Sequence, residues 1–420
     1  MNSDIKQRIE QINRGEVPGG YKKTAVGIVP QEWEYKKLKN IGKFSKGKGL
    51  PGSEMKATGV PCIGYGDIYT KYNFKFDKAQ NFVSQEVANN SLKCPKNSLF
   101  FTCSGETAIE IGKCVCYTGD EDIYVGGDIA VLSANAEVVP LFVGYQQNIP
   151  SLIKQKARLG QGHSVVHIYA DSLEKLGVAY PKNTYEQQRI ADILSKWDEA
   201  IELQEKLIEK LELQKKALMQ RLLTPKEDWK KVKLGDLAFM QSGGTPKSTV
   251  GKYYNGNIVW VSINDISSCG KYLSDSERKI TVEGLNNSSA RLFPKGTVLY
   301  AMYASIGKCC IALSECSTSQ AILGITTNEN LNSEYLYYFL LHNQEKIVTQ
   351  GQKGTQSNLN KEMVQNIKVD IPQTINQQIT IVKILNSVDR YIDSQSEKLK
   401  VLKQQQKTMQ QLLLTGIVRV

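Results

Sequence analysis

Two long segments of the chain carry the same spacing of apolar residues. In residues 182–224 and again in residues 374–420, apolar side chains recur at intervals that alternate between four and three residues. This spacing is the heptad pattern of a coiled-coil helix. Each apolar position of the first segment has a counterpart 191 residues later, as Ile381 follows Ile190. The predicted seam comprises Ile190, Leu194, Trp197, Ile201, Ile208 and Leu211 in the first helix, and Ile381, Leu385, Val388, Ile392, Leu399 and Leu402 in the second.

Polar residues interrupt both seams at matching places. Gln204 and Gln395 occupy one such position, and Lys215 and Gln406 occupy another. A polar residue in an apolar seam costs stability but penalises slipped registers and wrong partners. Two helices with equivalent polar positions in one chain predict an antiparallel pair. At 1.5 Å per residue, the first helix would be about 57 Å long.

Shorter apolar runs fill the rest of the chain. Runs rich in Val, Ile, Tyr and Phe, such as residues 257–263 and 297–303, are bounded by Gly, Pro, Asn and Asp and predict strands. Helical patterns follow near residues 141–156 and 333–348. The segment before each long helix is therefore predicted to be a mixed α/β domain of roughly 150 residues.

The two halves repeat each other in order. This order predicts an α+β protein with two similar mixed α/β domains, separated by two long antiparallel coiled-coil helices, in a pseudo-two-fold internal repeat. The matching segments are Pro30 to Trp33 with Pro225 to Trp229, residues 66–68 with 264–266, 94–101 with 293–300, Ile-Gly-Lys at 111–113 with 306–308, and Gln-Gln at 187–188 with 377–378.

The repeat sets the predicted domain boundaries. In the N-terminal segment, Ile5, Ile9 and Ile12 lie on one face of a short helix that ends at Gly15. We expect this helix to lie with the C-terminal long helix, because it precedes the first domain as the central helix precedes the second. The predicted parts are an N-terminal helix and lead-in segment (1–27), a first α/β domain (28–181), a central long helix (182–224), a second α/β domain (225–373) and a C-terminal long helix (374–420).

Charge and cysteine content indicate the kind of partner and the cellular compartment. The sequence holds 53 Lys and Arg against 42 Asp and Glu, a net charge of +11. This suits a polyanionic partner, although many basic proteins bind none. The nine cysteines contain no C-x-x-C pair, and their odd number fits reduced thiols. The N-terminus lacks the apolar stretch of a signal peptide, and no window reaches the length of a membrane span. We therefore expect a soluble, cytoplasmic protein that contacts no membrane.

Motifs for catalysis and cofactor binding are incomplete. Residues 42–48 approach a phosphate-binding loop, but Gly49 stands where the Ser or Thr that binds magnesium belongs. His163 and His167 have the i,i+4 spacing of metal ligands, but flanking glycines and β-branched residues oppose a helix there. No nucleophile elbow or Gly-rich turn for a dinucleotide or S-adenosylmethionine is present. We expect no catalytic residue, no metal and no cofactor bound by this chain.

Polar, glycine-rich segments, which we expect to form exposed loops, recur at two places in each half, the first at residues 45–49, and have the chemistry to contact DNA. Lys and Arg suit phosphates, and Arg, Lys, Asn, Gln, Ser and Thr suit base edges. Surface turns without function give the same pattern. The candidate DNA-binding residues are Ser45, Lys46, Lys48, Arg158, Gln161, His163 and Ser164 in the first half, and Ser242, Gly243, Gly244, Thr245, Lys247, Lys353, Thr355, Gln356 and Asn358 in the second.

Taken in order, these motifs resemble the specificity subunit of a type I restriction-modification system, over nearly the full chain. The shared features are the Pro-x-x-Trp start, Ser-Gly-Gly-Thr-Pro at 242–246, Gly-x-x-Gly-Thr-x-x-x-Leu at 351–359, Pro before Gln-Gln, and a long helix ending in Leu-Leu-Thr. The first half departs from this pattern at residues 45–49 and 162–164. Such differences are what two domains reading different half-sites would show.

The resemblance implies a mechanism and partners. Each domain would read one half of a split target in double-stranded DNA through the major groove, while the helices set the spacing. The helices would dock methyltransferase subunits, expected to number two and to carry S-adenosylmethionine. A restriction subunit that translocates DNA would add cleavage driven by ATP with magnesium. None of this catalysis would belong to the chain itself.

Two other functions stay open on the residues alone. A coiled-coil scaffold or adaptor with two protein-binding domains would show no sequence-selective DNA footprint. A self-contained methyltransferase or nuclease would show turnover by the purified chain.

Overall fold

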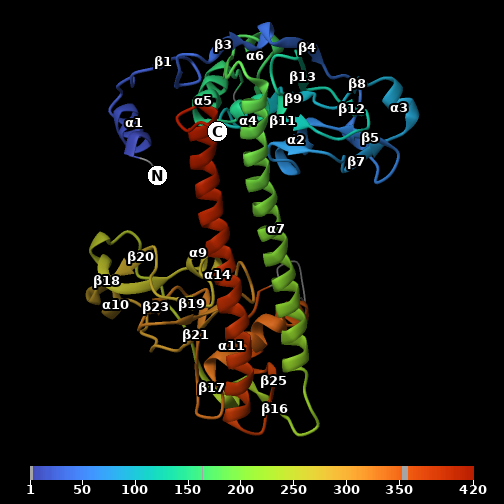
Figure 1. Ribbon diagram of the computed structural model, residues 1–420. Coiled ribbons are helices and arrows are strands. Elements are labelled where there is room, and N and C mark those ends of the chain that lie inside the picture. Colours follow the sequence, from blue (N-terminus) through green and yellow to red (C-terminus); the bar gives the residue numbers. More distant parts are fainter. Residues whose placement is uncertain (1–2, 163, 352–357) are drawn as a thin grey trace. The chain divides into compact units, whose positions relative to one another are not determined.

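The computed structural model describes residues 3–162, 164–351 and 358–420. The chain forms two compact units: unit 1 holds residues 1–204 and 398–420, and unit 2 holds residues 205–397. Both units share the two long helices, α7 (Thr184–Leu223) and α14 (Ile375–Leu414) (Figure 1). Unit 1 thus contains the start of α7 and the end of α14, and unit 2 contains the remainder of each.

The core of unit 1 is a five-stranded sheet in the order β4-β13-β9-β11-β6. Leu99 and Phe101 pack with α4 and the long helices, whereas Phe100 between them packs toward a second sheet, β7-β5-β12-β8. Successive side chains of a strand point to opposite faces, so both faces of the central sheet are covered. The elements are β4 (Gly42–Lys46), β5 (Val60–Ile63), β6 (Lys75–Phe76), β7 (Asn81–Val83), β8 (Leu92–Cys94), β9 (Leu99–Thr102), β11 (Cys114–Tyr117), β12 (Ile123–Val125), β13 (Ile129–Ala134) and α4 (Pro140–Gln146).

The two chain ends lie together in unit 1, which confirms the expectation from the repeat (Figure 1). Arg8 donates from Nη1 to the carbonyl oxygen of Ile417 at 2.9 Å, and the Tyr21 hydroxyl donates to that of Gly416 at 3.1 Å. The further elements of unit 1 are α1 (Ser3–Asn13), β1 (Tyr21–Lys23), β2 (Ile28–Pro30), β3 (Glu34–Lys37), α2 (Tyr65–Thr70), α3 (Gln85–Asn89), β10 (Ser104–Gly105), α5 (Pro150–Leu159), β14 (Val166–His167), α6 (Ala170–Leu173) and β15 (Gly177–Tyr180).

Unit 2 repeats the central sheet of unit 1, although its second sheet has three strands where that of unit 1 has four. Its five-stranded sheet has the order β17-β24-β21-β22-β19 and faces a sheet of order β20-β18-β23. Val298 and Tyr300 pack with α11, whereas Leu299 packs toward the second sheet. The elements are β16 (Lys230–Lys233), α8 (Leu234–Leu237), β17 (Ala238–Ser242), β18 (Tyr254–Val261), α9 (Ile263–Ser268), β19 (Tyr272–Leu273), β20 (Arg278–Ile280), α10 (Val282–Asn286), β21 (Val298–Ala301), β22 (Cys309–Ala312), β23 (Ser317–Thr318), β24 (Ile322–Thr327), α11 (Ser333–His342), α12 (Gln344–Gly351), α13 (Lys361–Gln365) and β25 (Lys368–Ile371).

The tryptophan that starts each half packs against the helix covering the central sheet. Trp33 meets Phe142 edge to face with ring centroids 6.1 Å apart, and Trp229 meets Tyr335 in the same way at 6.4 Å. Such aromatic contacts add to the burial of apolar area. The tryptophan that follows a proline at the start of each half is therefore a packing element.

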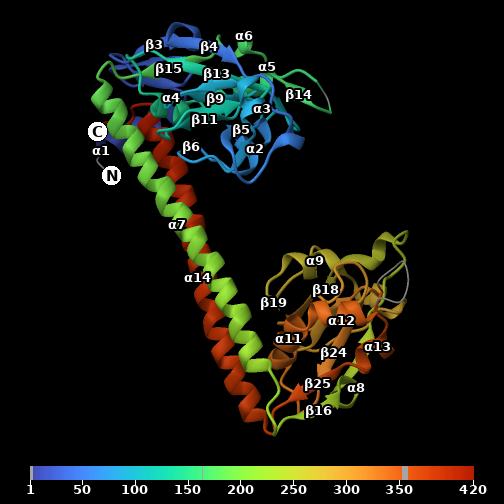
Figure 2. The same cartoon turned by 90° about the vertical axis from the view of Figure 1, so that its right-hand side faces the viewer.

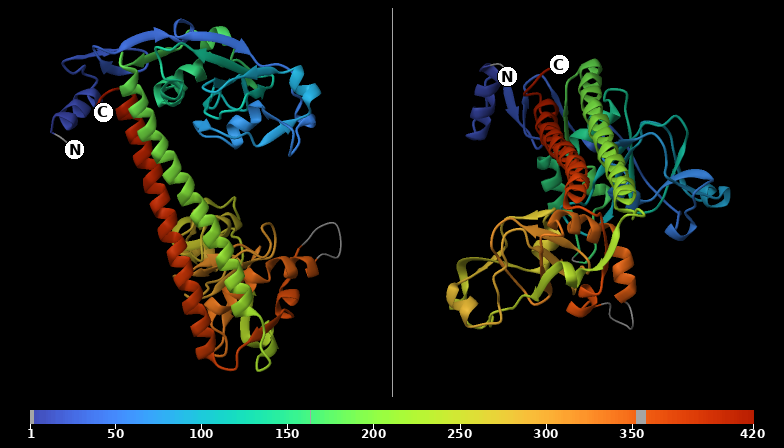
Figure 3. Two further views of the ribbon diagram at one scale, coloured as in Figure 1. Left: turned by 45° about the vertical axis from the view of Figure 1, so that its right-hand side comes forward. Right: turned by 90° about the horizontal axis from the view of Figure 1, so that it is seen from below.

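Within each unit the long helices lie side by side and run antiparallel (Figures 1, 2 and 3). In unit 1, Gln406 donates to Asp198, and Arg419 beyond the end of α14 pairs with Glu186 near the start of α7. In unit 2, the Lys215 ammonium lies 2.7 Å from the Asp389 carboxylate.

None of the predicted seam residues is exposed. This distribution is what a coiled-coil seam requires. Buried positions are Ile190, Leu194, Ile201, Gln204, Ile381, Leu385 and Ile392; half-buried positions are Trp197, Ile208, Leu211, Val388, Gln395, Leu399 and Leu402.

The repeated Gln-Gln motif joins each long helix to the domain before it. The Gln187 side chain accepts from the N–H of Val139 at 2.7 Å and donates to the carbonyl of Pro181 at 2.9 Å. Gln378 accepts from the N–H of Asn332 at 2.9 Å in the same way. These buried amides pair with backbone groups just before α4, α7 and α11. Substitution of either glutamine by an apolar residue would leave those backbone groups unpaired.

Candidate nucleic-acid interface

The first candidate segment of unit 1 lies partly on a strand. We predicted a loop at residues 45–49, but Ser45 and Lys46 belong to the edge strand β4, where they pair with Val131 and Ala130 of β13. The prediction was wrong because the Gly-rich sequence hid the backbone pairing of an edge strand, which pattern alone does not reveal. Lys46 and Lys48 are nevertheless exposed, and Ser45 is half-buried.

In the corresponding segment of unit 2, the prediction that Gly243 and Gly244 contact DNA is wrong. Ser242 ends β17 and is half-buried, but Gly243 and Gly244 are buried and cannot present a surface to DNA. A Cβ on Gly243 would lie 2.0 Å from the Thr318 side chain, and one on Gly244 would lie 2.2 Å from the Ser289 backbone. These glycines allow close packing of the backbone rather than close approach to a groove.

The residues after these glycines remain available for contact. Thr245 and Lys247 are exposed. The Thr245 hydroxyl donates to the Gln320 side chain, and the indole N–H of Trp260 donates to the carbonyl of Gly244 at 2.9 Å. Hydrogen bonds with Gln320 and Trp260 therefore hold the loop in place, while Lys247 is exposed to solvent.

Backbone hydrogen bonds bring three distant segments of unit 1 to one end of the central sheet. The N–H of Gly47 donates to the backbone carbonyl of Ile129 at 2.9 Å, and that of Cys103 donates to the backbone carbonyl of Asp128 at 2.7 Å. The N–H of Ile168 then donates to the Cys103 carbonyl at 2.9 Å. The first candidate segment, and Ile168 shortly after the second, thus flank the end of β9.

Unit 2 builds the same junction. The N–H of Gly243 donates to the carbonyl of Ile322 at 3.1 Å, and that of Met302 donates to the carbonyl of Ala321 at 3.0 Å. The N–H of Leu359 donates to the Met302 carbonyl at 3.0 Å. We call this arrangement the three-segment junction. It carries exposed lysines in both units but differs between them in the other polar side chains.

The second candidate segments are described only in part. Arg158 in the last turn of α5 is exposed, as are Gln161 and Ser164, and the backbone of Gln161 pairs with His167. Asn358 of unit 2 is exposed and directly precedes the junction residue Leu359. His163, Lys353, Thr355 and Gln356 lie outside the described residues.

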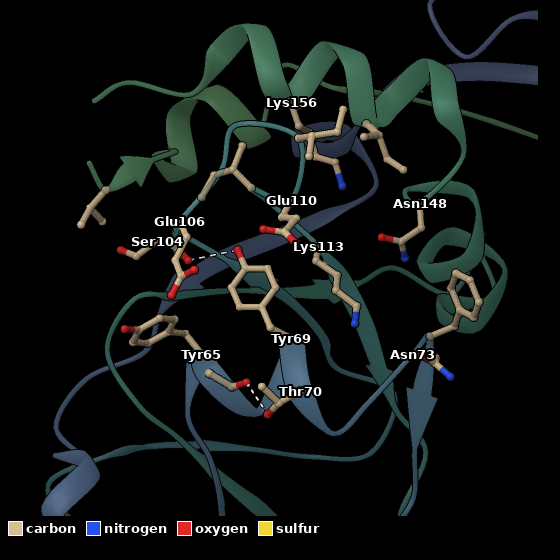
Figure 4. Close-up of a pocket in the computed structure, with 17 residues that line it drawn as sticks. Tyr65, Tyr69, Thr70, Asn73, Ser104, Glu106, Glu110, Lys113, Asn148 and Lys156 are labelled. Atoms are coloured by element: carbon tan, nitrogen blue, oxygen red, sulfur yellow. Dashed lines mark hydrogen bonds between the residues drawn. The ribbon is translucent and has the colours of Figure 1, made fainter. Parts of the chain in front are cut away.

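A cavity of about 860 Å³ adjoins the junction of unit 1 (Figure 4). It lies between α2, α5 and the residues that connect β9 to β11, and Val165, which directly follows the second candidate segment, also lines it. Tyr69 stands within it, and its hydroxyl donates to Thr102 at 2.7 Å. Burial raises the pKa of this hydroxyl to about 12, so Tyr69 stays protonated and acts as a hydrogen-bond donor.

Two lysines at the cavity are engaged with the backbone. Lys156 donates to the carbonyls of Gly112 at 2.5 Å and Gln147 at 2.9 Å, and burial lowers its pKa to about 8. Lys113 donates to the carbonyl of Tyr72 at 2.6 Å, and burial lowers its pKa as well. Burial also raises the pKa of the Cys103 thiol at the junction to about 11, which keeps the thiol protonated and poorly nucleophilic. These groups favour hydrogen bonding over covalent chemistry.

Sequence reasoning missed a pair of contacts between each domain and the helix that follows it. The Tyr145 hydroxyl of α4 donates to Asp198 of α7, and the Tyr338 hydroxyl of α11 donates to Asp389 of α14 at 2.5 Å. The two aspartates are 191 residues apart, the same interval as the seam. That interval was the available signal, because it relates polar as well as apolar positions.

Among the described residues, no group of three or more His, Cys, Asp or Glu is arranged to hold a metal ion. Within the same residues, no helix is both long and apolar enough to cross a membrane.

A known family model matches the chain twice. The model described as the type I restriction modification DNA specificity domain matches residues 30–213 and again residues 226–404. The two matches cover most of the chain, one in each half.

Individual relatives agree with this match. The chain is 24% identical over 419 residues to the type I restriction enzyme MjaVIII specificity subunit of Methanocaldococcus jannaschii, covering 93% of this chain and 94% of that protein. It is 29% identical over 181 residues to the MjaIX specificity subunit of the same organism, covering 42% of this chain and 41% of that protein. The crystal structure of a type I restriction-modification S subunit from M. genitalium shares the fold, with a TM-score of 0.57, 17% identity and coverage of 91% of this chain and 96% of that one.

Proposed function

The chain belongs to the type I restriction-modification DNA specificity family, and we propose from this premise that each unit reads one half of a bipartite DNA target. The observation that carries the proposal is the three-segment junction, which both units build with the same backbone hydrogen bonds. A shared framework with different side chains is what two readers of different sequences require. DNA recognition needs such a division, because phosphate contacts position the protein and base contacts specify the sequence.

The exposed residues at each junction supply both kinds of contact. Lys46 and Lys48 of unit 1 and Lys247 of unit 2 suit phosphates or guanine. Thr245 and Asn358 of unit 2 suit base edges, as Gln161 and Ser164 do in unit 1.

We further propose that α7 and α14 fix the spacing of the half-sites and dock two methyltransferase subunits. Large apolar side chains exposed on these helices support a docking role, because solvent alone does not favour them. Leu203 is 67% exposed on α7, Leu213 is 63% exposed on the same helix, and Tyr391 is 50% exposed on α14.

In this proposal the chain is not itself an enzyme. S-adenosylmethionine would bind the methyltransferase subunits, and ATP and magnesium would serve a restriction subunit. The complex would act on DNA in the cytoplasm, a setting in which the nine free cysteines stay reduced.

Exchange of one domain tests the division of labour. Residues 28–181 are replaced by the matching segment of another family member, and the target of the full chain with its methyltransferase subunits is determined by mapping methylated bases. We expect one half of the target to change and the other half to stay.

A change in both halves, or in neither, contradicts the proposal. A complex with no sequence-selective footprint would instead favour the adaptor, and turnover by the purified chain alone would favour an enzyme.

A further inference from the structure

The connection that leaves the junction is longer in unit 1 than in unit 2. Both connections end in the same turn: Gly112 donates to Thr102 and Gly307 donates to Ala301, each at 3.1 Å, and both glycines have positive φ. Between Cys103 and Ile111 the chain has seven residues, 104–110, whereas between Met302 and Ile306 it has three. The equivalent turns locate the difference in this connection, outside the shared framework.

The longer connection carries two carboxylates to the cavity of unit 1. Glu106 and Glu110 line the cavity opposite Tyr69 of α2, as Figure 4 shows. Glu110 accepts from the Thr107 hydroxyl at 2.6 Å, which orients its carboxylate. Within the described part of the chain, Glu106 forms no hydrogen bond or ion pair. The shorter connection of unit 2, Tyr303 to Ser305, contains no acidic residue.

The two lysines beside these carboxylates have partners on the backbone. The Lys156 ammonium donates to two carbonyls and the Lys113 ammonium to one, and in the residues that the structure describes neither lysine forms an ion pair with those two carboxylates. Two apolar side chains complete the rim of the cavity: Ile109 is 60% exposed and Val165 is 48% exposed. Val165 directly follows Ser164, the last residue of a candidate DNA-binding segment, so the cavity adjoins that segment.

Carboxylates on a surface that meets DNA are repelled by phosphates, and this cost is offset where they accept hydrogen bonds from amino groups of bases. Glu and Asp accept from the N4 amino group of cytosine, and adenine N6 offers a similar donor in the major groove. Exposed apolar side chains contact the thymine methyl group. Carboxylates next to an apolar rim, one of them oriented by Thr107, thus match the edge of a base pair better than they match a phosphate.

We propose that the unit 1 cavity is a base-reading site in which Glu106 and Glu110 accept hydrogen bonds from the exocyclic amino group of an adenine or cytosine. Ile109 and Val165 contact the neighbouring apolar surface of the base pair. The proposal rests on the proposed function, and it adds a specificity determinant that unit 2 lacks.

The test deletes the amino group and the carboxylates separately and together. The target of the full chain with its methyltransferase subunits is first selected from a random duplex library, and domain exchange assigns one half to unit 1. Each adenine of that half is replaced by unsubstituted purine and each cytosine by pyrimidin-2-one. Dissociation constants are measured for the original chain and for Glu106→Ala with Glu110→Ala.

At one or two positions, loss of the amino group should weaken binding by the original chain about 10-fold or more, and should weaken binding by the variant far less. Glu106→Gln with Glu110→Gln should keep part of the preference, because an amide oxygen still accepts. The control is Glu121→Ala, which alters an exposed carboxylate beyond the opposite end of β11 and should behave as the original chain.

Equal weakening of the original chain and the alanine variant overturns the base-reading site while leaving the proposed function intact. Loss of methyltransferase assembly in the variant, with unchanged base preference, overturns it in favour of a protein-docking cavity. Failure of the original chain to select any target would instead remove the proposed function itself.

Discussion

Gly244 lies so close to the backbone of Ser289 that a methyl group would not fit between them. An added Cβ would be 2.2 Å from the Ser289 carbonyl carbon, and both segments are fixed by neighbours: Gly244 donates to Thr318 and accepts from Trp260. Backbone atoms cannot move aside as the end of a flexible side chain can. The Ser-Gly-Gly-Thr-Pro motif is therefore a packing requirement of unit 2.

Gly244→Ala should destabilise unit 2 by about 1–3 kcal/mol, the usual cost of overpacking. Urea unfolding of the full chain measures the change, with tryptophan fluorescence as a probe because Trp260 contacts this loop. Gly251→Ala is the matched control: an added Cβ there meets nothing within 4 Å. Identical unfolding curves for the two variants would contradict this role of Gly244.

At the scale of the helices, the two units surround an equivalent aspartate with different partners. Asp198 and Asp389 occupy equivalent places and each accepts from a tyrosine of the covering helix. Across the helix pair, Asp198 accepts from Gln406, whereas Asp389 meets the ammonium of Lys215. Burial raises the pKa of Asp198 to about 6, and the amide of Gln406 offers a hydrogen bond but no positive charge to offset this.

Gln406→Lys should supply that charge, lower the pKa of Asp198 and raise the thermal midpoint at pH 7.5 by about 2–4 °C, which corresponds to ~1 kcal/mol. Lys75 and Glu199 also act on Asp198, and neither changes in this variant. Lys215→Gln, at the equivalent place in unit 2, is the reciprocal variant and should lower stability. A lower midpoint for Gln406→Lys would contradict the assigned cause.

The same residue predicts a pH dependence. The folded protein holds the Asp198 proton more tightly than the unfolded chain does, so this group's contribution to stability falls as pH rises from about 4 to about 6. Removing the titrating group by Asp198→Asn should flatten the stability profile in this window. Denaturant midpoints at half-unit pH steps measure the slope, and an unchanged slope would argue against burial of the charge as its origin.

For the whole molecule, the positions of the lysines matter more for DNA binding than the net positive charge does. The net charge is +11, yet several lysines are engaged away from the junctions, as Lys96 is with Asp120. Lys46 and Lys48 are exposed at the junction of unit 1. Binding to DNA should therefore depend on particular lysines rather than on total charge.

Lys46→Gln and Lys48→Gln should each weaken DNA binding about equally across sequences and reduce the slope of log affinity against log salt by about 1. Fluorescence anisotropy from about 50 to about 200 mM salt measures the slope. Lys96→Gln, which changes the net charge equally at the opposite end of β9, should leave the slope unchanged. An equal effect of all three variants would mean that only net charge matters.

The sequence by itself determined the architecture: the two long helices, the antiparallel pairing and the doubled α+β domain. Heptad spacing and strand alternation are local, periodic properties, and the constant interval of 191 residues relates Ile190 to Ile381 without any knowledge of the fold. For the candidate interface, the sequence located the lysines that are exposed, such as Lys48 and Lys247.

Only the tertiary structure decided which residues meet. It placed Ser45 on an edge strand, buried Gly243 and brought the carboxylates of Glu106 and Glu110 to a cavity. It also gave Asp198 its partner Gln406, more than two hundred residues away. A local pattern fixes the face that a segment buries, but the partner of a polar group depends on which distant segments pack against it.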